Sequence, residues 1–221
     1  MLNLRLLPIL AALLLPVSAQ EAVPLFNGRD LTGWTTAKGE PVSAGWEVTP
    51  DGELHRASKG GDIFTAREYT NYELSWDWKI STGGNSGIKY RVMSFPQKGL
   101  LGCEYQLLDD AGHPDAKVGA RRQTASLYDI LPPSPDKNLK APGEWNTSRV
   151  VVKGQQVEHW LNGAKVLSVD LTGEAFQTGL AGSKFKDVPG FALNRTGRIM
   201  IQDHNDEVWF RNLTLKELPE E

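Results

Sequence analysis

The most regular run in the sequence is Tyr-Glu-Leu-Ser-Trp-Asp-Trp-Lys-Ile, from Tyr72 to Ile80. Large apolar side chains occupy every second position, and polar or charged side chains occupy the positions between them. Successive side chains of an extended chain point to opposite faces. The run therefore predicts a β-strand with one face in a hydrophobic core and the other facing water.

Shorter runs of the same kind lie on both sides of this strand and are separated by turn residues. Gly83 to Gly87 is a glycine-rich turn, and we expect it to join residues 72–80 to residues 88–93 as a long antiparallel pair. Asn162-Gly163 is the strongest hairpin signal in the chain. Further strands are expected over residues 45–49, 53–57, 63–66, 102–108, 144–153, 156–161, 165–169, 197–202 and 207–218, the last with a bulge near Arg211-Asn212.

About a dozen strands with closely spaced turns favour an all-β fold. No amphipathic helix of convincing length is predicted, and residues 172–194 are expected to form a loop. The proline-rich run 131–135 ends a long irregular stretch of the kind that forms lids or binding loops. The sequence thus predicts one β-sandwich domain of jelly-roll type over residues 20–221.

The first 19 residues are interpreted as a signal peptide. Arg5 precedes an apolar run over residues 6–17, and Val17-Ser18-Ala19 provides small residues for cleavage before Gln20. The run is short for a membrane span, although an uncleaved anchor is the alternative. We expect export, either secretion or release into a bacterial periplasm, with no stable membrane insertion after cleavage.

Composition limits the partners. The net charge is −3 and there is no basic block, so nucleic acid is not expected to bind. Cys103 is the only cysteine and cannot form an internal disulfide; its place on the apolar side of its strand predicts a buried thiol.

Groups able to transfer protons gather between Gly102 and Asp115. Glu104 and Gln106 alternate with apolar residues and are expected on the polar face of a strand, followed by a loop with Asp109, Asp110 and His113. A carboxylate, an amide and an imidazole on one surface suit proton-transfer chemistry on a sugar. The alternative is that the acidic loop is simply solvated.

Several other chemistries lack their patterns. The four histidines show no zinc-binding spacing, and there is no Gly-x-Ser-x-Gly elbow for acyl transfer. Glu104 is one candidate carboxylate for a glycosidase, but the Glu-x-Asp-x-x-Glu strand of laminarinase-like jelly rolls is absent. The loops at Asp109-Asp110 and Asp203–Asp206 offer oxygen ligands for calcium, without EF-hand spacing.

Aromatic side chains beside polar strand residues favour a carbohydrate ligand, because a flat ring can lie against the apolar face of a sugar. Trp145, Trp160 and Trp209 have such neighbours, and Tyr128 lies in the loop after the Glu104 strand. Each tryptophan could instead belong to the core.

Seven motifs in order resemble those of the 3-keto-disaccharide hydrolase family, also described as 3-keto-glucoside lyase/hydratase. The resemblance covers nearly all of the chain after residue 19. The motifs are Leu25-Phe26-Asn27-Gly28 with Leu31-Thr32-Gly33-Trp34, Gly84-Asn85-Ser86-Gly87, Glu104-Tyr105-Gln106-Leu107-Leu108-Asp109, Ala125-Ser126-Leu127-Tyr128-Asp129, Gly143-Glu144-Trp145-Asn146, Val157-Glu158-His159-Trp160-Leu161-Asn162-Gly163 and Ile201-Gln202-Asp203-His204.

The resemblance implies a concanavalin-like sandwich and cleavage of glycosides already oxidised at carbon 3, by elimination and hydration. From this chemistry and the motif positions we expect His113 or His204 as base and Glu104 as its orienting partner or as the acid. The expected substrate-binding residues are Gln106, Asp109, Tyr128, His159, Trp160, Lys184 and Asp203.

Three questions stay open at this level. No cofactor is certain, but a divalent metal such as calcium could polarise the ketone. A non-catalytic carbohydrate-binding module on the same fold is the rival hypothesis, and an ordinary glycosidase is a weaker one. A small carbohydrate is the expected ligand under all three hypotheses, namely the 3-keto-glycoside enzyme, the binding module and the ordinary glycosidase.

Overall fold

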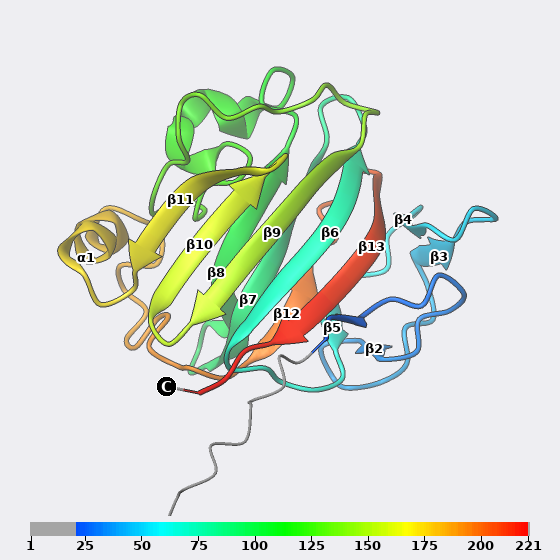
Figure 1. The fold of residues 1–221 in the computed structure, drawn as a ribbon, viewed down its shortest axis with the longest axis horizontal. Helices are drawn as coiled ribbons and strands as arrows, with labels where there is room; N and C mark the ends of the chain where they lie inside the picture. Colours follow the sequence, from blue (N-terminus) through cyan, green and yellow to red (C-terminus); the bar gives the residue numbers. More distant parts are fainter. Residues whose placement is uncertain (1–20, 221) are drawn as a thin grey trace, which may run out of the picture.

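The computed structural model describes residues 21–220, which form two antiparallel β-sheets packed face to face (Figure 1). Within this described part, the larger sheet has the strand order β11-β10-β9-β6-β13-β4-β3, and β1 pairs with β13. Its strands are β1 (Val23–Pro24), β3 (Trp46–Val48), β4 (Leu54–Arg56), β6 (Tyr72–Ile80), β9 (Asn146–Lys153), β10 (Gln156–Leu161), β11 (Ala164–Asp170) and β13 (Val208–Glu217).

The smaller sheet has the strand order β2-β5-β12-β7-β8. Its strands are β2 (Trp34–Thr35), β5 (Ile63–Thr65), β7 (Asn85–Phe95), β8 (Gly99–Leu108) and β12 (Arg198–Ile201). The predicted all-β sandwich is therefore confirmed.

Strand β6 lies at the centre of the larger sheet and has the predicted alternation of buried and half-buried residues. Trp76 and Trp78 are both fully buried between the sheets. The indole N–H of Trp78 donates to Ser148 on β9 at 2.8 Å, so its polar atom is satisfied inside the core. Burial of such large apolar surfaces drives the packing of the two layers.

The expected pairing of residues 72–80 with 88–93 is wrong. Strand β6 pairs with β9 and β13 in the larger sheet, whereas β7 pairs with β8 and β12 in the smaller one. The glycine-rich turn between them carries the chain from one layer to the other. The backbone N–H of Gly83 donates to the Asp109 carboxylate at 2.8 Å, which ties the turn to the end of β8.

Two other turn predictions are confirmed. Asn162 and Gly163 both have positive φ, 47° and 85°, and close the hairpin between β10 and β11. The register of β13 against β6 shifts between Arg211 and Thr214, where Asn212 has a φ of 51°. This is the bulge expected from the shift in the apolar phase.

The expected loop at residues 172–194 contains a helix, α1 (Glu174–Ala181). The eight-residue helix buries Phe176 completely, and Gly179 lets its backbone lie against Ile130, because a Cβ there would come within 2.5 Å of the Ile130 carbonyl oxygen. So short a helix, with two buried positions, gives little periodic signal in the sequence. Two 3₁₀ turns, η1 (Pro114–Val118) and η2 (Ala120–Arg122), order part of the loop after β8.

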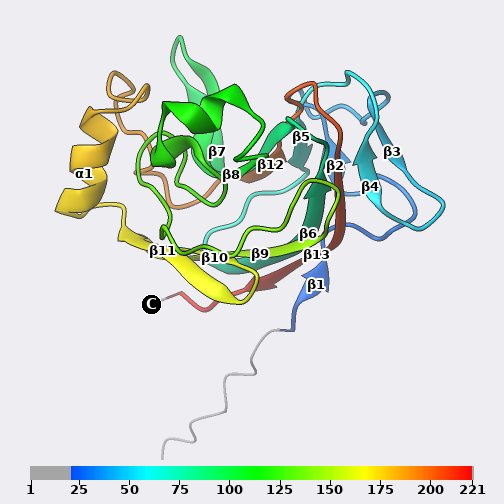
Figure 2. The same ribbon diagram turned by 90° about the horizontal axis from the view of Figure 1, so that it is seen from above.

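Loops lie over part of the outer face of the smaller sheet (Figure 2). Residues 124–131, here called the strap, run along the edge of β8. The Tyr128 N–H donates to the Glu104 carbonyl at 3.0 Å, and the Ala125 N–H donates to the Gln106 carbonyl at 2.9 Å. Glu104 and Gln106 are only 4% and 1% exposed, although they face away from the core between the sheets.

Cys103 points the other way and is buried, as predicted, and burial raises the pKa of its thiol to about 12. Among residues 21–220, no helix has the length and apolar character needed to cross a bilayer. The predicted signal peptide, residues 1–19, lies outside the described residues.

Candidate active site

A small hollow opens on the outer face of the smaller sheet, with a volume of about 60 Å³. This central hollow is lined by Asn85, Glu104, Gln106, Tyr128, Lys184, Gln202 and His204. Five of these residues were predicted from the sequence as catalytic or substrate-binding: Glu104, Gln106, Tyr128, Lys184 and His204. The fold thus brings residues from β7, β8, the strap and two further loops to one place.

The Glu104 carboxylate lies at the floor of the central hollow. Lys89 is its register partner on β7, and the Lys89 ammonium lies 3.6 Å from Glu104 Oε2. Gly87 makes room for the carboxylate, because a Cβ at Gly87 would lie 2.6 Å from Glu104 Oε1. The carboxylate is buried and held between a cation and a bare backbone.

Side-chain amides surround this carboxylate. The amides of Gln106 and Asn85 contact each other at 3.1 Å. With its nitrogen turned toward Glu104, the Gln106 amide donates to Oε1 at 3.1 Å. Gln202 adds an amide oxygen that is buried without a hydrogen-bond partner among the described residues. Unsatisfied buried polar groups of this kind are commonly completed by a ligand or by water.

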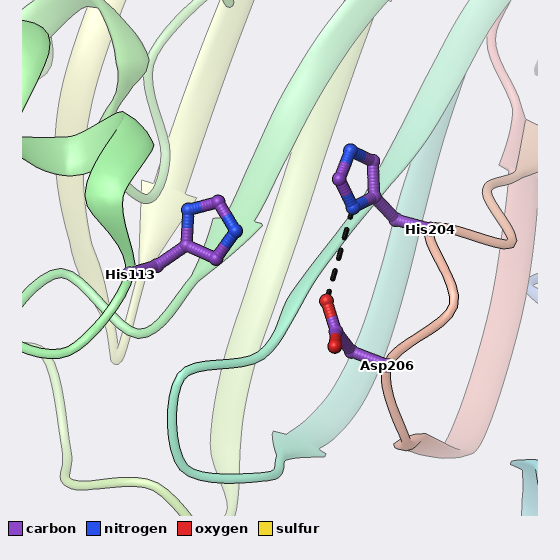
Figure 3. Close-up of side chains that lie close together, drawn as sticks. All are labelled: His113, His204 and Asp206. Atoms are coloured by element: carbon purple, nitrogen blue, oxygen red, sulfur yellow. Dashed lines mark ion pairs between the residues drawn. The ribbon is translucent and has the colours of Figure 1, made fainter.

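Two imidazoles face each other beside the central hollow (Figure 3). His113 lies on the loop after β8 and His204 on the loop between β12 and β13, with ring centroids 6.1 Å apart and planes at 78°. Asp206 Oδ2 lies 3.8 Å from Nδ1 of His204. The Asp206 carboxylate also accepts the Asn85 N–H at 3.0 Å, which fixes it in place. In the neutral ring, a proton on Nδ1 would lie toward this charge and Nε2 would carry the lone pair.

His113 is held in the other tautomer. Its Nδ1 accepts the backbone N–H of Asp115 at 3.0 Å, as the N-cap of η1. An Nδ1 that accepts this bond carries no proton, so the proton of the neutral ring is on Nε2. His113 therefore presents an N–H donor, whereas His204 presents a base.

His113, His204 and Asp206 are the described residues that could hold a metal ion: one ligand atom from each lies within 4.8 Å of the others. Coordination through His113 Nε2 would require a lone pair on that atom. The bond from the Asp115 N–H to Nδ1 places a proton there instead. In this arrangement the cluster suits proton transfer better than a metal.

Tyr128 and Lys184 also line the central hollow. The Lys184 ammonium lies 4.3 Å from the centroid of the Tyr128 ring, and the Tyr128 hydroxyl donates to Asp115 at 2.7 Å. Burial lowers the pKa of Lys184, and the charge of Glu104 opposes that effect. Burial and the bond to Asp115 raise the pKa of Tyr128, which keeps the phenol protonated.

The carboxylates of Asp109 and Asp203, both expected to contact the sugar, are bonded to other groups of the protein. The Asp109 carboxylate accepts three backbone N–H groups, from Gly83, Ala111 and Gly112, and so shapes the loop that carries His113. The Asp203 carboxylate accepts the N–H groups of Gly60 and Gly61 and pairs with Arg56 at 2.6 Å. These bonds lower the pKa of both carboxyls although burial opposes them.

Neither His159 nor Trp160, both expected to contact the sugar, lines the central hollow. His159 is buried between the sheets, bonded to the Tyr90 hydroxyl at 2.9 Å and to the Ala125 carbonyl at 3.0 Å. Burial lowers its pKa to about 4. Trp160, its neighbour on β10, faces the opposite side, where the Arg149 guanidinium covers its ring at 4.0 Å.

Four residues near the site were not singled out in the sequence: Asn85, Lys89, Gln202 and Asp206. Asn85 and Gln202 fall inside the motifs quoted above, so the resemblance contained a signal for them. Lys89 has only its register position opposite Glu104, which needs the strand pairing to be seen. Asp206 lies in the loop that was expected to offer calcium ligands, and its position beside His204 comes from the structure.

Comparisons with known proteins find relatives that match most of the chain. A family model described as "3-keto-alpha-glucoside-1,2-lyase-like domain" matches residues 21–216. A 3-keto-disaccharide hydrolase of Bacteroides thetaiotaomicron is 35% identical, with 94% of this chain and 82% of that protein aligned.

Solved structures from Parabacteroides distasonis show the same fold. One, described as an inferred glycosyl hydrolase, has a TM-score of 0.81 at 36% identity and covers 90% of this chain and 94% of its own. A second such protein has a TM-score of 0.67 at 29% identity, with 90% of this chain and all of the other covered. Both likenesses extend over the whole sandwich.

Proposed function

The chain belongs to the 3-keto-α-glucoside-1,2-lyase-like domain family, and from this we propose that it cleaves glycosides whose sugar is already oxidised to a ketone at carbon 3. The proposed reaction has two stages. The glycosidic bond breaks by elimination across carbons 1 and 2, and water then adds to the resulting 2-hydroxy-3-keto-glucal. The net result is hydrolysis.

The ketone makes this route accessible. It acidifies the hydrogen on carbon 2, because the carbanion left behind is stabilised as an enolate. The enolate then expels the aglycone from carbon 1, and hydration returns a proton to carbon 2 and hydroxide to carbon 1. The protein must supply a base for the carbon-2 hydrogen and donors for the enolate and the departing oxygen.

One observation carries the proposal: the lining of the central hollow combines a base and a cationic donor with a single carboxylate. Glu104 is the carboxylate, and His204 and Lys184 lie in the same lining. A two-carboxylate glycosidase needs an acid and a base or nucleophile on either side of the bond. The lining supports enolate chemistry better than direct hydrolysis.

The tautomers support a division of labour between the two histidines. His204, with Asp206 at Nδ1, would take the carbon-2 hydrogen on Nε2. His113 would donate its Nε2–H to an oxygen of the substrate, since its Nδ1 is engaged with Asp115. This ranks His204 first as the base.

The enolate oxygen needs positive charge near it. Lys184 and Lys89 both lie near Glu104, and the lowered pKa of Lys184 makes its proton easier to transfer. Gln106 and Asn85 would bind sugar hydroxyls through their amides. The Tyr128 hydroxyl already donates a hydrogen bond to Asp115, so Tyr128 serves chiefly to position Lys184.

The size of the central hollow fits the reacting edge of one sugar. About 60 Å³ is far below the volume of a typical ligand site, which is roughly 300–1,000 Å³. A larger cavity, of about 380 Å³, shares Lys184 with the central hollow, and another of about 490 Å³ lies beside Asp62. The cavity beside Lys184 would hold the rest of a disaccharide.

Turnover of a defined substrate tests the function. Purified protein is incubated with 3-keto-trehalose and with trehalose, and with a 3-keto-aryl glucoside and its unoxidised parent, while free aglycone is measured. We expect cleavage of the oxidised substrates only. Cleavage of the unoxidised parents at equal rates would identify an ordinary glycosidase, and binding of unmodified sugars without cleavage of any substrate would identify a binding module.

A metal is the alternative way to stabilise the enolate, and His113, His204 and Asp206 would be its ligands. Dialysis against a chelator tests it: the acid–base assignment predicts unchanged turnover after removal of divalent ions. Lost activity that calcium or another divalent ion restores would support the metal.

Export is a separate proposal that rests on the sequence of residues 1–19. Expression in a bacterial host followed by fractionation would show the protein in the periplasm or medium. Its N-terminus should be Gln20, whereas retention of Met1 would contradict cleavage.

A further inference from the structure

We propose that the cavity beside Lys184 binds the leaving group and selects one that carries negative charge, such as a carboxylate or sulfate. This inference rests on the proposed function, because it assigns the aglycone side of the same site. The cavity, here called the cationic cavity, is lined by Val118, Gly119, Arg121, Arg122, Asp129, Gly182, Ser183, Lys184 and Lys186.

The cationic cavity adjoins the reacting groups and is large enough for a second ring. Its volume is about 380 Å³, against about 60 Å³ for the central hollow. Lys184 lines both, so a substrate whose glycosidic oxygen lies near Lys184 would extend from one into the other. The group on the far side of that oxygen is the aglycone.

Its charge is strongly unbalanced. Four cationic side chains line it and Asp129 is the one acid among them. Asp129 is already committed, since it accepts from Arg122 Nε at 2.8 Å and from the Lys184 N–H at 2.7 Å. Arg122 is further neutralised by Asp115 at 2.8 Å.

The remaining cations lack such partners. Over residues 21–220, no carboxylate forms an ion pair with the side chains of Arg121, Lys184 or Lys186. The whole chain carries a net charge of −3, so this excess is local. Cationic lining of a cavity raises the local concentration of anions and steers them to it.

Arg121 has a second explanation, which the test has to separate. Its Nη1 lies 3.3 Å from the Cβ position of Gly182, the C-cap residue of α1. Cations are stabilised by the free carbonyls at a helix C-terminus. Lys186 is not explained in this way and therefore needs a variant of its own.

The excess of cations is not shared by the larger cavity beside Asp62. The cavity beside Asp62 has both signs of charge, from Lys38, Glu40 and Asp62, and includes the Phe64 ring. Mixed polar groups with an aromatic ring suit a neutral sugar. An anionic group would be favoured only at the cationic cavity.

A pair of matched substrates tests the inference. The aglycones are 4-(carboxymethyl)phenol and its amide, 4-(carbamoylmethyl)phenol, each as the 3-keto-glucoside in both anomeric forms; the methylene keeps their leaving abilities alike. At low salt we expect kcat/KM to be about three- to tenfold higher for the substrate with the anionic aglycone, because two or three partly exposed ion pairs contribute that much. The difference should lie in KM rather than in kcat. The preference should fade at 0.5 M NaCl.

The double variant Arg121→Gln/Lys186→Gln keeps Lys184, so it should lose most of this preference and turn over the neutral substrate at the wild-type rate. Neither residue lines the central hollow. Equal kcat/KM for the two substrates in the wild type, or a preference that is undiminished in the double variant, would overturn the inference.

Calorimetric binding of the free acid and of its amide to wild type and double variant needs no turnover. Tighter binding of the acid that the double variant loses supports the inference even if no 3-keto-glucoside is cleaved. Equal binding of acid and amide overturns it whatever the activity. If the neutral 3-keto-glucoside is not cleaved, the proposed function is refuted, and this outcome does not depend on the binding result.

Discussion

The carboxylate of Glu104 lies across the backbone of Gly87, so closely that a Cβ built on Gly87 would be 2.6 Å from Oε1. The two residues are on neighbouring strands, β8 and β7, with Lys89 next along the same face. The floor of the central hollow thus depends on a missing side chain.

Gly87→Ala should displace the carboxylate and reduce turnover of a 3-keto-glucoside by roughly 10- to 100-fold, because small displacements of reacting groups have effects of that size. The matched control is Gly102→Ala. A Cβ there would crowd the Tyr90 carbonyl oxygen at 2.6 Å instead of Glu104. Both variants should lose stability, but only Gly87→Ala should lose activity beyond its folded fraction; equal specific activities would refute the role of Glu104.

His113 can be tested with a variant that keeps its structural bond. Asparagine is a good N-cap residue, so His113→Asn can still accept the Asp115 N–H while losing the Nε2–H donor. His113→Ala loses both. We expect kcat to fall about 100-fold in both variants, with thermal stability reduced only in His113→Ala. Wild-type kcat in His113→Asn would show that the donor is not used.

Asp203 and Asp206, on the loop between β12 and β13, should separate into different roles. Asp206→Asn removes the charge beside His204 and should lower kcat about tenfold without unfolding the protein. Asp203→Asn breaks a buried ion pair with Arg56 and should cost about 3 kcal/mol of unfolding free energy. Urea unfolding and steady-state kinetics on both variants distinguish these effects, and the reverse pattern would contradict both assignments.

Much of the fold could be predicted because its signals are local. The alternation in Tyr72–Ile80 and the Asn162-Gly163 turn each specify one element within a few residues. The connection from β6 to β7 could not be predicted, because a glycine-rich turn permits either a hairpin or a crossing. Contacts with Asp109, 26 residues away in the chain, decide between them.

The site follows the same division. Glu104 and Gln106 could be placed outward from their alternation, but Lys89 joins them only through pairing of β7 with β8. His159 shares its side of β10 with Val157 and Leu161, and all three are buried. Period-two alternation alone predicts this burial, whereas its polar residue type suggests a contact with the sugar.

Burial of His159 has a consequence for stability in acid. Its pKa is lowered to about 4, so the unfolded chain takes up a proton below pH 6.5 while the folded protein does not. Acidification therefore favours unfolding over this window, and the loss between pH 7.5 and pH 5 should be about 2 kcal/mol.

Urea unfolding at the two pH values measures this loss. His159→Gln, which has no titrating ring, should flatten the pH dependence by that amount, although its stability at pH 7.5 will be lower. His204→Gln is the control, because that side chain is 47% exposed. A pH dependence unchanged in His159→Gln would show that another group is responsible.

The most direct test of the elimination route is the fate of the hydrogen on carbon 2. The reaction is run to partial completion in D₂O with a 3-keto-glucoside, and the released 3-keto-glucose is examined by mass spectrometry and NMR, with 3-keto-glucose incubated alone as the exchange control. Elimination and hydration predict one deuteron at carbon 2 of the product, in excess of the deuterium that exchanges into 3-keto-glucose alone. The His204→Ala variant should not form this deuterated product. A product formed by the wild-type enzyme with hydrogen retained at carbon 2 would contradict the mechanism.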